Sequence, residues 1–455
     1  MRTAYRGVGI VLLICVLAAV SRAQADAVFR AASPATPGPS PSTAASPPAI
    51  PAGKIEHVVI IFQENRSTDD LFSGFPGADT VRSGPAAGGR TIALQPIPFE
   101  APGDLDHSHT GFEKDDDNGR MDGFLRAKYI RFEGVTDPPY AHVPDDETKP
   151  LWTLAKRYTL ADRMFQTNQG PSFPAHLYII GGTSAPDPKS DLLASENPGD
   201  KEQSKPDGGC DSPADMLVKL IDPSGSEDHR LYPCFENPTV MDLLDKKGLS
   251  WKYYEPHHGG LWDGPDAIRH LRDQPNDWAN VVTPETTIFK DIAAGGLPDV
   301  SWVIPNGRNS DHPGSLSDTG PSWVASIVNA IGSSPYWRST AIFITWDDWG
   351  GWYDHVAPPT YNSYELGFRV PLIVVSPYAK RGYVSHRQHE FGSIIRFIEE
   401  DSGLGSLGRT DVRSDDLSDC FDFGQAPTSF TPVETKYPMA DFVQSSVSFS
   451  PPDDE

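Results

Sequence analysis

The chain has 455 residues, of which 38 are Lys or Arg and 62 are Asp or Glu, giving a formal net charge of −24 at pH 7. Such an acidic surface repels polyanions, so the composition argues against binding to a nucleic acid. The length permits one large α/β domain or two ordinary ones with a sizeable core. A negatively charged substrate would have to be attracted by positive charge placed locally, such as a bound metal ion.

The first 25 residues have the pattern of a bacterial secretory signal peptide. Arg2 and Arg6 precede an apolar stretch, and Ala23-Gln24-Ala25 forms a cleavage site before Asp26. Removal of this leader takes away three arginines and no acid, which changes the formal charge to about −27. No later stretch is apolar over enough length to span a bilayer. We therefore expect a Sec-exported protein that is secreted or periplasmic, with no transmembrane segment after signal removal.

Composition divides the rest of the chain into three parts. Residues 26–53 are rich in Pro, Ala and Ser without apolar periodicity, which predicts a flexible or polyproline linker. The folded domain is expected over residues 54–425, with a polar, loop-rich excursion or cap at about residues 185–227. Residues 426–455 are acidic and rich in Ser and Pro, which indicates a loosely packed tail.

Short β-branched runs alternate with helical patterns along the folded domain. The predicted strands are Ile55–Phe62, Val300–Ile304, Ala341–Trp346 and Val370–Val375, and the predicted helices include Pro321–Ile331 and Phe391–Glu400. This alternation predicts an α/β fold with a largely parallel central sheet and helices on both faces. In such sheets the C-terminal ends of the strands meet at the active-site crevice.

Polar side chains follow two of the predicted strands at this edge. Glu64 and Asn65 come after the first strand, and the adjacent carboxylates Asp347 and Asp348 come between a buried run and a pair of glycines. Neighbouring carboxylates repel each other and resist desolvation, and a divalent cation offsets both effects. From these residues alone, a surface turn with solvated acids is an equal alternative for Asp347-Asp348, and a turn in which Asn65 caps a helix is an equal alternative for Glu64-Asn65.

Three cysteines remain after removal of the predicted leader: Cys210, Cys234 and Cys420. An oxidising compartment favours disulfide formation. Cys210 and Cys234 could pair across a loop rich in Asp, Pro, Ser and Gly, which would leave Cys420 free. The sequence does not decide this pairing.

Five motifs, spread in order along the domain, identify a family resemblance. They are His57-Val58-Val59-Ile60-Ile61-Phe62-Gln63-Glu64-Asn65-Arg66-Ser67, Gly170-Pro171-Ser172-Phe173-Pro174, Asn309-Ser310-Asp311-His312-Pro313, Trp346-Asp347-Asp348-Trp349-Gly350-Gly351-Trp352-Tyr353-Asp354-His355-Val356 and Gly367-Phe368-Arg369-Val370-Pro371. From about Lys54 to Phe423 the chain resembles the bacterial phosphoesterase family of phospholipases C and AcpA-type acid phosphatases. The resemblance implies an alkaline-phosphatase-like fold and a phosphate ester substrate, either a soluble monoester or a phospholipid.

The resemblance also implies a metal site and a nucleophile. Carried over by position, Glu64, Asn65, Asp347 and Asp348 would be the ligands of one divalent metal ion. All four supply oxygen, which suits a hard or borderline cation of unknown identity.

Ser172 corresponds to the hydroxyl nucleophile of the family. The local sequence agrees, because Ser172 could cap a helix and Pro174 suits a first helical turn. The free N–H groups and positive dipole end of a helix start favour a phosphate oxyanion. Without the resemblance, a helix cap would be the simpler interpretation of this serine.

Histidines would complete the site. His312 matches an active-site histidine of the family, and two histidine pairs resemble pocket histidines of the acid phosphatase branch. From these pairs we favour His107 over His109 and His258 over His257. One histidine would protonate the leaving oxygen while others hold phosphoryl oxygens.

The resemblance therefore predicts a metal-assisted phosphoric ester hydrolase, acting as an acid phosphatase or phospholipase C through a phosphoseryl intermediate. A non-catalytic exported protein that binds phosphate-bearing ligands on the same scaffold is the alternative. One departure concerns the substrate: Thr68-Asp69-Asp70-Leu71-Phe72 stands where many phospholipases have Phe-Asp and an aromatic residue. The wall of the pocket is therefore expected to differ.

Overall fold

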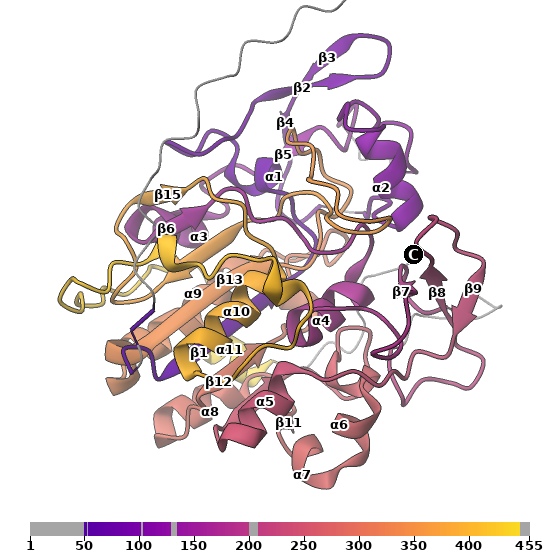
Figure 1. Ribbon diagram of the computed structural model, residues 1–455. Coiled ribbons are helices and arrows are strands. Elements are labelled where there is room, and N and C mark those ends of the chain that lie inside the picture. Colours follow the sequence, from indigo (N-terminus) through magenta and orange to yellow (C-terminus); the bar gives the residue numbers. More distant parts are fainter. Residues whose placement is uncertain (1–49, 52, 102, 129–133, 200–207, 446–455) are drawn as a thin grey trace, which may run out of the picture. The chain divides into compact units, whose positions relative to one another are not determined.

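The computed structural model describes residues 50–445 except 52, 102, 129–133 and 200–207 (Figure 1). The predicted signal peptide and nearly all of the predicted linker lie outside the described residues. Within the described ranges, no helix combines the length and the apolar character needed to cross a membrane.

A central eight-stranded sheet organises the domain. Its strands, in spatial order, are β11 (Val281–Val282), β10 (Trp251–Tyr254), β12 (Val300–Val303), β1 (His57–Gln63), β13 (Thr340–Trp346), β14 (Leu372–Val375), β6 (Thr159–Ala161) and β15 (Tyr383–Ser385). β14 runs antiparallel to both of its neighbours, and the other pairings are parallel. The predicted largely parallel sheet is therefore confirmed.

Helices lie on both faces of this sheet (Figure 1). The helices are α1 (Thr68–Phe72), α2 (His109–Asp116), α3 (Lys149–Arg157), α4 (Ser172–Gly181), α5 (Val240–Lys247), α6 (Arg269–Asp273), α7 (Pro275–Trp278), α8 (Thr287–Ala294), α9 (Gly320–Gly332), α10 (Phe391–Ser402) and α11 (Met439–Gln444). α9 contacts α3, α8 and α11, whereas α4 contacts α5 and α10. The ring of Phe62 on β1 meets Phe391 of α10 at 5.2 Å and His176 of α4 at 4.9 Å, so these two helices cover one face at the site end of the sheet.

The antiparallel direction of β14 differs from the expectation that Val370–Val375 continues the parallel pattern. After β13, the chain from Asp347 to Pro371 forms no helix and does not cross the sheet. It therefore re-enters from the edge that it left, which reverses its direction. β6, β11 and β15 were not predicted, because runs of two or three residues are too short to show a period, and the four-residue strand β10 was also missed.

Three small sheets lie outside the central sheet (Figure 1). They are formed by β2 (Ser83–Ala86) with β3 (Arg90–Ala93), by β4 (Gln95–Pro96) with β5 (Ala141–His142), and by β7 (Leu193–Ala194), β8 (Val218–Ile221) and β9 (His229–Leu231). The last of these lies largely within the predicted cap. Cys210 and Cys234 form a disulfide there, and Cys420 is buried with a free thiol.

The segment after residue 425 packs on α9. The side-chain amide of Asn329 donates to the carbonyl of Val433 and accepts from its N–H, each at 2.8 Å. The Phe442 ring contacts Trp323 at 5.5 Å. The described part of the predicted tail is thus docked more firmly than its composition suggests.

Candidate active site

The two polar pairs leave the sheet side by side. β1 and β13 are parallel neighbours whose last residues, Gln63 and Trp346, are in register. Glu64-Asn65 and Asp347-Asp348 therefore emerge together, and the backbone N–H of Asn65 donates to Asp347 Oδ1 at 3.0 Å. All four residues are fully buried.

The turn after β1 depends on a close backbone approach. Asn65 has a φ of 56°, a left-handed conformation that asparagine tolerates better than most residues. Gly350 also has a positive φ, and a Cβ atom there would lie 2.4 Å from the Asn65 carbonyl oxygen. The glycine after the paired aspartates therefore allows the two strand ends to come together.

The side-chain oxygens in this cluster fit a cation. The Asn65 amide oxygen lies 3.0 Å from Glu64 Oε2 and 3.3 Å from Asp347 Oδ1, so three acceptors face one another. With the amide oxygen and nitrogen exchanged, Asn65 would donate hydrogen bonds to both carboxylates, whereas a metal ligand would present its oxygen to them. Asp347 Oδ2 is buried and has no hydrogen-bond partner among the described residues. Converging oxygen donors of this kind suit a divalent cation.

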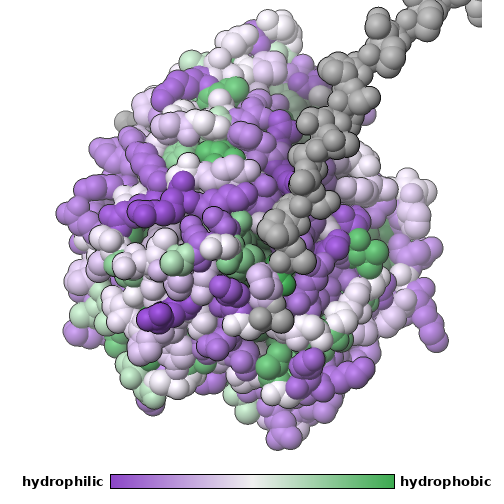
Figure 2. Space-filling view, turned by 60° about the vertical axis from the view of Figure 1, so that its left-hand side comes forward, coloured by the Kyte–Doolittle hydropathy of each residue, from purple (hydrophilic) through white to green (hydrophobic). Residues whose placement is uncertain are grey.

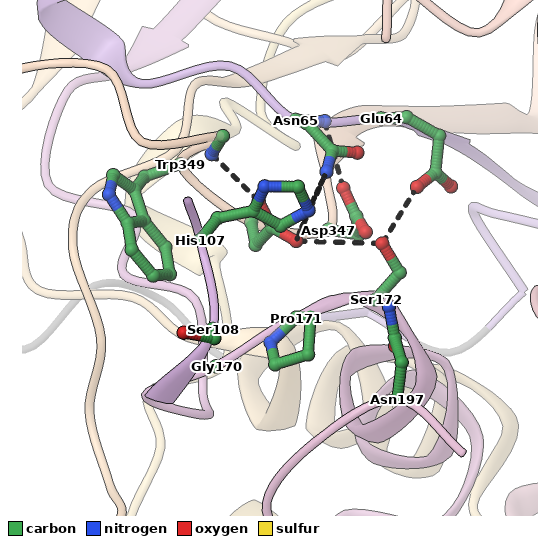
Figure 3. Close-up of polar contacts among 12 residues, drawn as sticks. Glu64, Asn65, His107, Ser108, Gly170, Pro171, Ser172, Asn197, Asp347 and Trp349 are labelled. Atoms are coloured by element: carbon green, nitrogen blue, oxygen red, sulfur yellow. Dashed lines mark hydrogen bonds and ion pairs between the residues drawn. The ribbon is translucent and has the colours of Figure 1, made fainter. Parts of the chain in front are cut away.

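Ser172 faces this oxygen cluster (Figure 3). Its hydroxyl donates toward Glu64 Oε2 at 3.2 Å and lies 3.5 Å from Asp348 Oδ2. Ser172 is the first residue of α4, and Pro171 occupies the N-cap position. The expected helix-capping role is therefore wrong, and the hydroxyl is directed to the site instead.

One N–H group at the start of α4 already has a partner. The backbone N–H of Phe173 donates to Asn197 Oδ1 at 2.9 Å. Contrary to the expectation of free helix-start donors, this group is not open to a phosphate oxygen. The side chain beside it belongs to the cap.

His107 and His312 share one arrangement. Nδ1 of each ring bonds a backbone carbonyl, that of Leu105 at 2.8 Å and that of Pro313 at 2.6 Å. Nε2 of each ring faces the Asn65 amide, at 2.8 Å for His107 and 3.3 Å for His312. A carbonyl partner on Nδ1 fixes the ring and leaves Nε2 as the atom that meets the site.

The loop that carries His312 is held from two sides. Arg66 Nε donates to the carbonyl of Asp311 at 3.0 Å, and Trp346 Nε1 donates to Asp311 Oδ2 at 3.1 Å. Burial raises the pKa of Asp311 to about 7. A Cβ atom on Gly320 would lie 1.6 Å from Asp311 Oδ1, so α9 must begin with a residue that has no side chain.

The structure does not bring His258 into this group. Its Nδ1 lies 2.9 Å from Glu255 Oε1 and its ring packs on Trp278 at 4.9 Å. The side chain is 39% exposed, whereas the other predicted site residues are buried. Glu255, His258 and Asp263 form a separate acidic cluster.

A buried histidine that sequence analysis missed does reach the site. His176 lies one helical turn after Ser172, and its Nε2 is 3.1 Å from Glu64 Oε1. Its Nδ1 is 3.1 Å from the Tyr253 hydroxyl, which donates to the carbonyl of Trp262 at 2.8 Å. The signal available was the four-residue spacing from Ser172, which places two side chains on the same helix face.

A second polar cluster supports the loop after Asp348. Arg369 forms a two-bond ion pair with Asp354, at 2.9 and 3.0 Å, and lies 3.4 Å from Asp69 Oδ2. His355 Nδ1 also lies against Asp69, at 2.6 Å. Although these acids with His355 could hold a metal ion by spacing, the guanidinium already supplies the compensating charge.

The α/β sheet, the oxygen cluster and the hydroxyl at a helix start are together the features of a phosphoesterase, a hydrolase of phosphoric ester bonds. The sequence pattern of the Phosphoesterase family matches residues 55–405. The chain belongs to this family, and the resemblance inferred from the five motifs is confirmed.

Several curated relatives carry phospholipase names. The chain is 25% identical over 436 residues to the non-hemolytic phospholipase C of Pseudomonas aeruginosa, a match covering 80% of this chain and 57% of that protein. It is 24% identical to phospholipase C B of Mycobacterium tuberculosis, a match covering 83% of this chain and 80% of that protein. Non-specific phospholipase C6 of Arabidopsis thaliana is 35% identical over 52% of this chain and 42% of its own. The chain spans little more than half the length of the Pseudomonas relative.

Similar solved structures include a protein of the alkaline phosphatase superfamily from Vibrio parahaemolyticus. It is 11% identical, covers 80% of this chain and 72% of its own, and has a TM-score of 0.37. Murine ectonucleotide pyrophosphatase/phosphodiesterase 5 is 8% identical and has a TM-score of 0.38. The match covers 60% of this chain and 95% of the murine chain. Scores of this size are low, so the family assignment rests on the sequence matches.

Proposed function

We propose that this chain is an exported, metal-assisted phosphoric ester hydrolase with Ser172 as its nucleophile. The observation that carries the proposal is the position of the Ser172 hydroxyl, 3.2 Å from Glu64 and 3.5 Å from Asp348 in a cluster of buried oxygen donors. Family membership supports hydrolysis of a phosphoric ester. Export is supported by the predicted signal peptide.

Glu64, Asn65, Asp347 and Asp348 would hold one divalent cation. When bound, this ion supplies positive charge that lowers the pKa of the Ser172 hydroxyl and offsets the charge of the phosphoryl group. It also accounts for the attraction of an anionic substrate to a protein with a net charge of −24.

The remaining residues position and transfer protons. The Ser172 oxygen forms a bond to phosphorus while the bond from phosphorus to the leaving oxygen breaks. The proton of the Ser172 hydroxyl is released to water, and His107 or His312, in the form protonated on both ring nitrogens, gives its Nε2 proton to the leaving oxygen. Water then attacks phosphorus in the phosphoseryl group, which releases phosphate or a phosphomonoester and restores the hydroxyl of Ser172.

The substrate is proposed to be a soluble phosphate monoester or a phospholipid. The phospholipase C names of the relatives favour a lipid diester. On the face drawn in Figure 2, hydrophilic residues dominate and the hydrophobic groups are small and separate. Assays of an aryl phosphate monoester beside phosphatidylcholine micelles distinguish the two.

The direct test is Ser172→Ala in the metal-loaded protein. Loss of the nucleophile should reduce turnover by about 10³-fold or more, with metal content and melting temperature unchanged. Ser326→Ala, at a buried serine on α9 away from the site, is the matched control and should keep full turnover. Substantial activity in the Ser172 variant would defeat the assignment, and phosphate binding without turnover in the wild type would favour the non-catalytic alternative.

A further inference from the structure

The cap places an amide side chain beside the nucleophile. Asn197 follows β7, and its side chain points toward Ser172 at the start of α4 (Figure 3). Only 8% of this residue is exposed. Its contact with the helix is the hydrogen bond that Oδ1 accepts from the Phe173 N–H at 2.9 Å.

This hydrogen bond fixes which end of the amide is available. Because an N–H group requires an acceptor, Oδ1 must face Phe173, and Nδ2 is the other end. Nδ2 is buried and has no hydrogen-bond partner among the described residues. Burial of an unpaired amide N–H is unfavourable, so this nitrogen points to an acceptor that the protein itself does not provide.

The segment around Asn197 is held in place. Before it, the Ser195 N–H donates to the carbonyl of Lys219 at 3.0 Å, and the Tyr364 hydroxyl donates to the carbonyl of Ser195 at 2.9 Å. After it, Gly199 and Leu217 exchange two backbone hydrogen bonds of 3.0 Å. Asn197 is therefore anchored on both sides, as a preorganised donor must be.

The cap also contacts the nucleophile loop directly. A Cβ atom on Gly170 would lie 2.6 Å from the carbonyl oxygen of Ser195, so a side chain there would force the two segments apart. Gly170 thus permits a close approach between the loop that carries Ser172 and the segment that carries Asn197.

We propose that Asn197 Nδ2 donates a hydrogen bond to a non-bridging phosphoryl oxygen when a phosphate ester or inorganic phosphate lies at Ser172. The two side-chain atoms that the Ser172 hydroxyl meets, Glu64 Oε2 and Asp348 Oδ2, are carboxylate oxygens, which cannot donate to that oxygen. A neutral amide donor stabilises the developing charge without titrating. The inference rests on the proposed function and deepens it, since it makes the cap part of the phosphate site.

Asn197→Asp is the sharpest test, because it keeps the oxygen acceptor for the Phe173 N–H and removes the donor. Turnover of an aryl phosphate monoester should fall by about 10²-fold, the effect of losing one preorganised donor. The dissociation constant of inorganic phosphate, measured by calorimetry, should rise by about 10-fold or more. Metal content and melting temperature should stay at the wild-type values.

Asn329→Asp on α9 is the matched control and should leave turnover and phosphate affinity unchanged. If the aspartate variant does not fold, Asn197→Ala also lacks the donor, and a second variant with Phe173→Pro shows whether the freed N–H of residue 173 takes its place. Wild-type phosphate affinity in a folded Asn197 variant would overturn the inference. Because the phosphate measurement does not need turnover, failure of the proposed function would appear separately, as full activity in Ser172→Ala.

Discussion

At the scale of single residues, one buried histidine connects the helix of the nucleophile to the oxygen cluster. His176 lies 3.1 Å from Glu64 Oε1 and 3.1 Å from the Tyr253 hydroxyl. Its ring also packs on Phe62 at 4.9 Å. A group that hydrogen-bonds to a metal-binding side chain on the side away from the metal orients that side chain. Removal of such groups typically costs about 10- to 100-fold in metal affinity or activity.

We therefore predict that His176→Phe weakens the affinity for a divalent cation by about 10-fold or more, because Glu64 loses the partner that orients it. His176→Gln, whose amide nitrogen can take the place of Nε2, should recover most of that affinity. Metal titration followed by calorimetry measures both variants. An unchanged dissociation constant in His176→Phe would mean that the histidine only fills space.

Much of the site was predictable from the motifs and from the polar residues that follow predicted strands, because neighbouring parallel strands bring their C-terminal ends together. The structure groups Glu64, Asn65, Asp347 and Asp348 with Ser172, His107 and His312. The direction of His258 depends on packing against Trp278, which the sequence does not reveal. Asn197 lies in a loop-rich segment without periodicity, where only the folded cap brings it to α4.

At the scale of elements, α10 contains an acid whose surroundings disfavour its charge. Asp401 lies in the last turn of α10, where the helix dipole disfavours a negative group. Burial raises its pKa to about 7. Asp401 Oδ1 has no hydrogen-bond partner in the described ranges. The folded state therefore holds this proton more tightly than the unfolded chain does, and the contribution to stability is lost as the pH rises from about 4 to 7.

Asp401→Asn removes that titration. The melting temperature of the variant, relative to wild type, should rise as the pH is raised from 4.5 to 8, because only the wild type then ionises a buried acid. Asp441→Asn, at an exposed acid on α11, is the control and should show a nearly constant difference. A constant difference for Asp401→Asn across this range would contradict the assignment.

The length of each strand and the path of the chain between strands determine which parts of the fold the sequence could predict. β1 and β13 are seven-residue buried strands, long enough for their apolar runs to be recognised. β14 was also found, but its direction follows from the path of the chain between Asp347 and Pro371, and no local pattern records that path. Strands such as β11, with two residues, form because β10 offers an open edge.

At the scale of the whole molecule, repulsion between negative charges affects the stability of the fold. The chain carries a net charge of −24, and two of its buried carboxylates, Glu64 and Asp347, have oxygen atoms within 4.8 Å of each other. We expect these groups to destabilise the folded state without a cation and to stabilise it with one, because a ligand that binds only the folded protein shifts the unfolding equilibrium.

We expect EDTA to lower the melting temperature and a divalent cation to restore it. At a concentration of about 100 times the dissociation constant, the ion should add about 2.7 kcal/mol to the free energy of unfolding. KCl at matched ionic strength is the control for screening. Asp347→Asn should respond much less, and a wild-type melting temperature unaffected by EDTA would exclude a stabilising metal site.

The Cys210–Cys234 disulfide gives the cap a closed covalent loop. β8 and the exposed strand β9 both lie inside this loop. A protease that cuts the backbone once within it produces two fragments that remain one molecule, joined through sulfur. After such a cut, the covalent link between the two fragments would last until the disulfide is reduced.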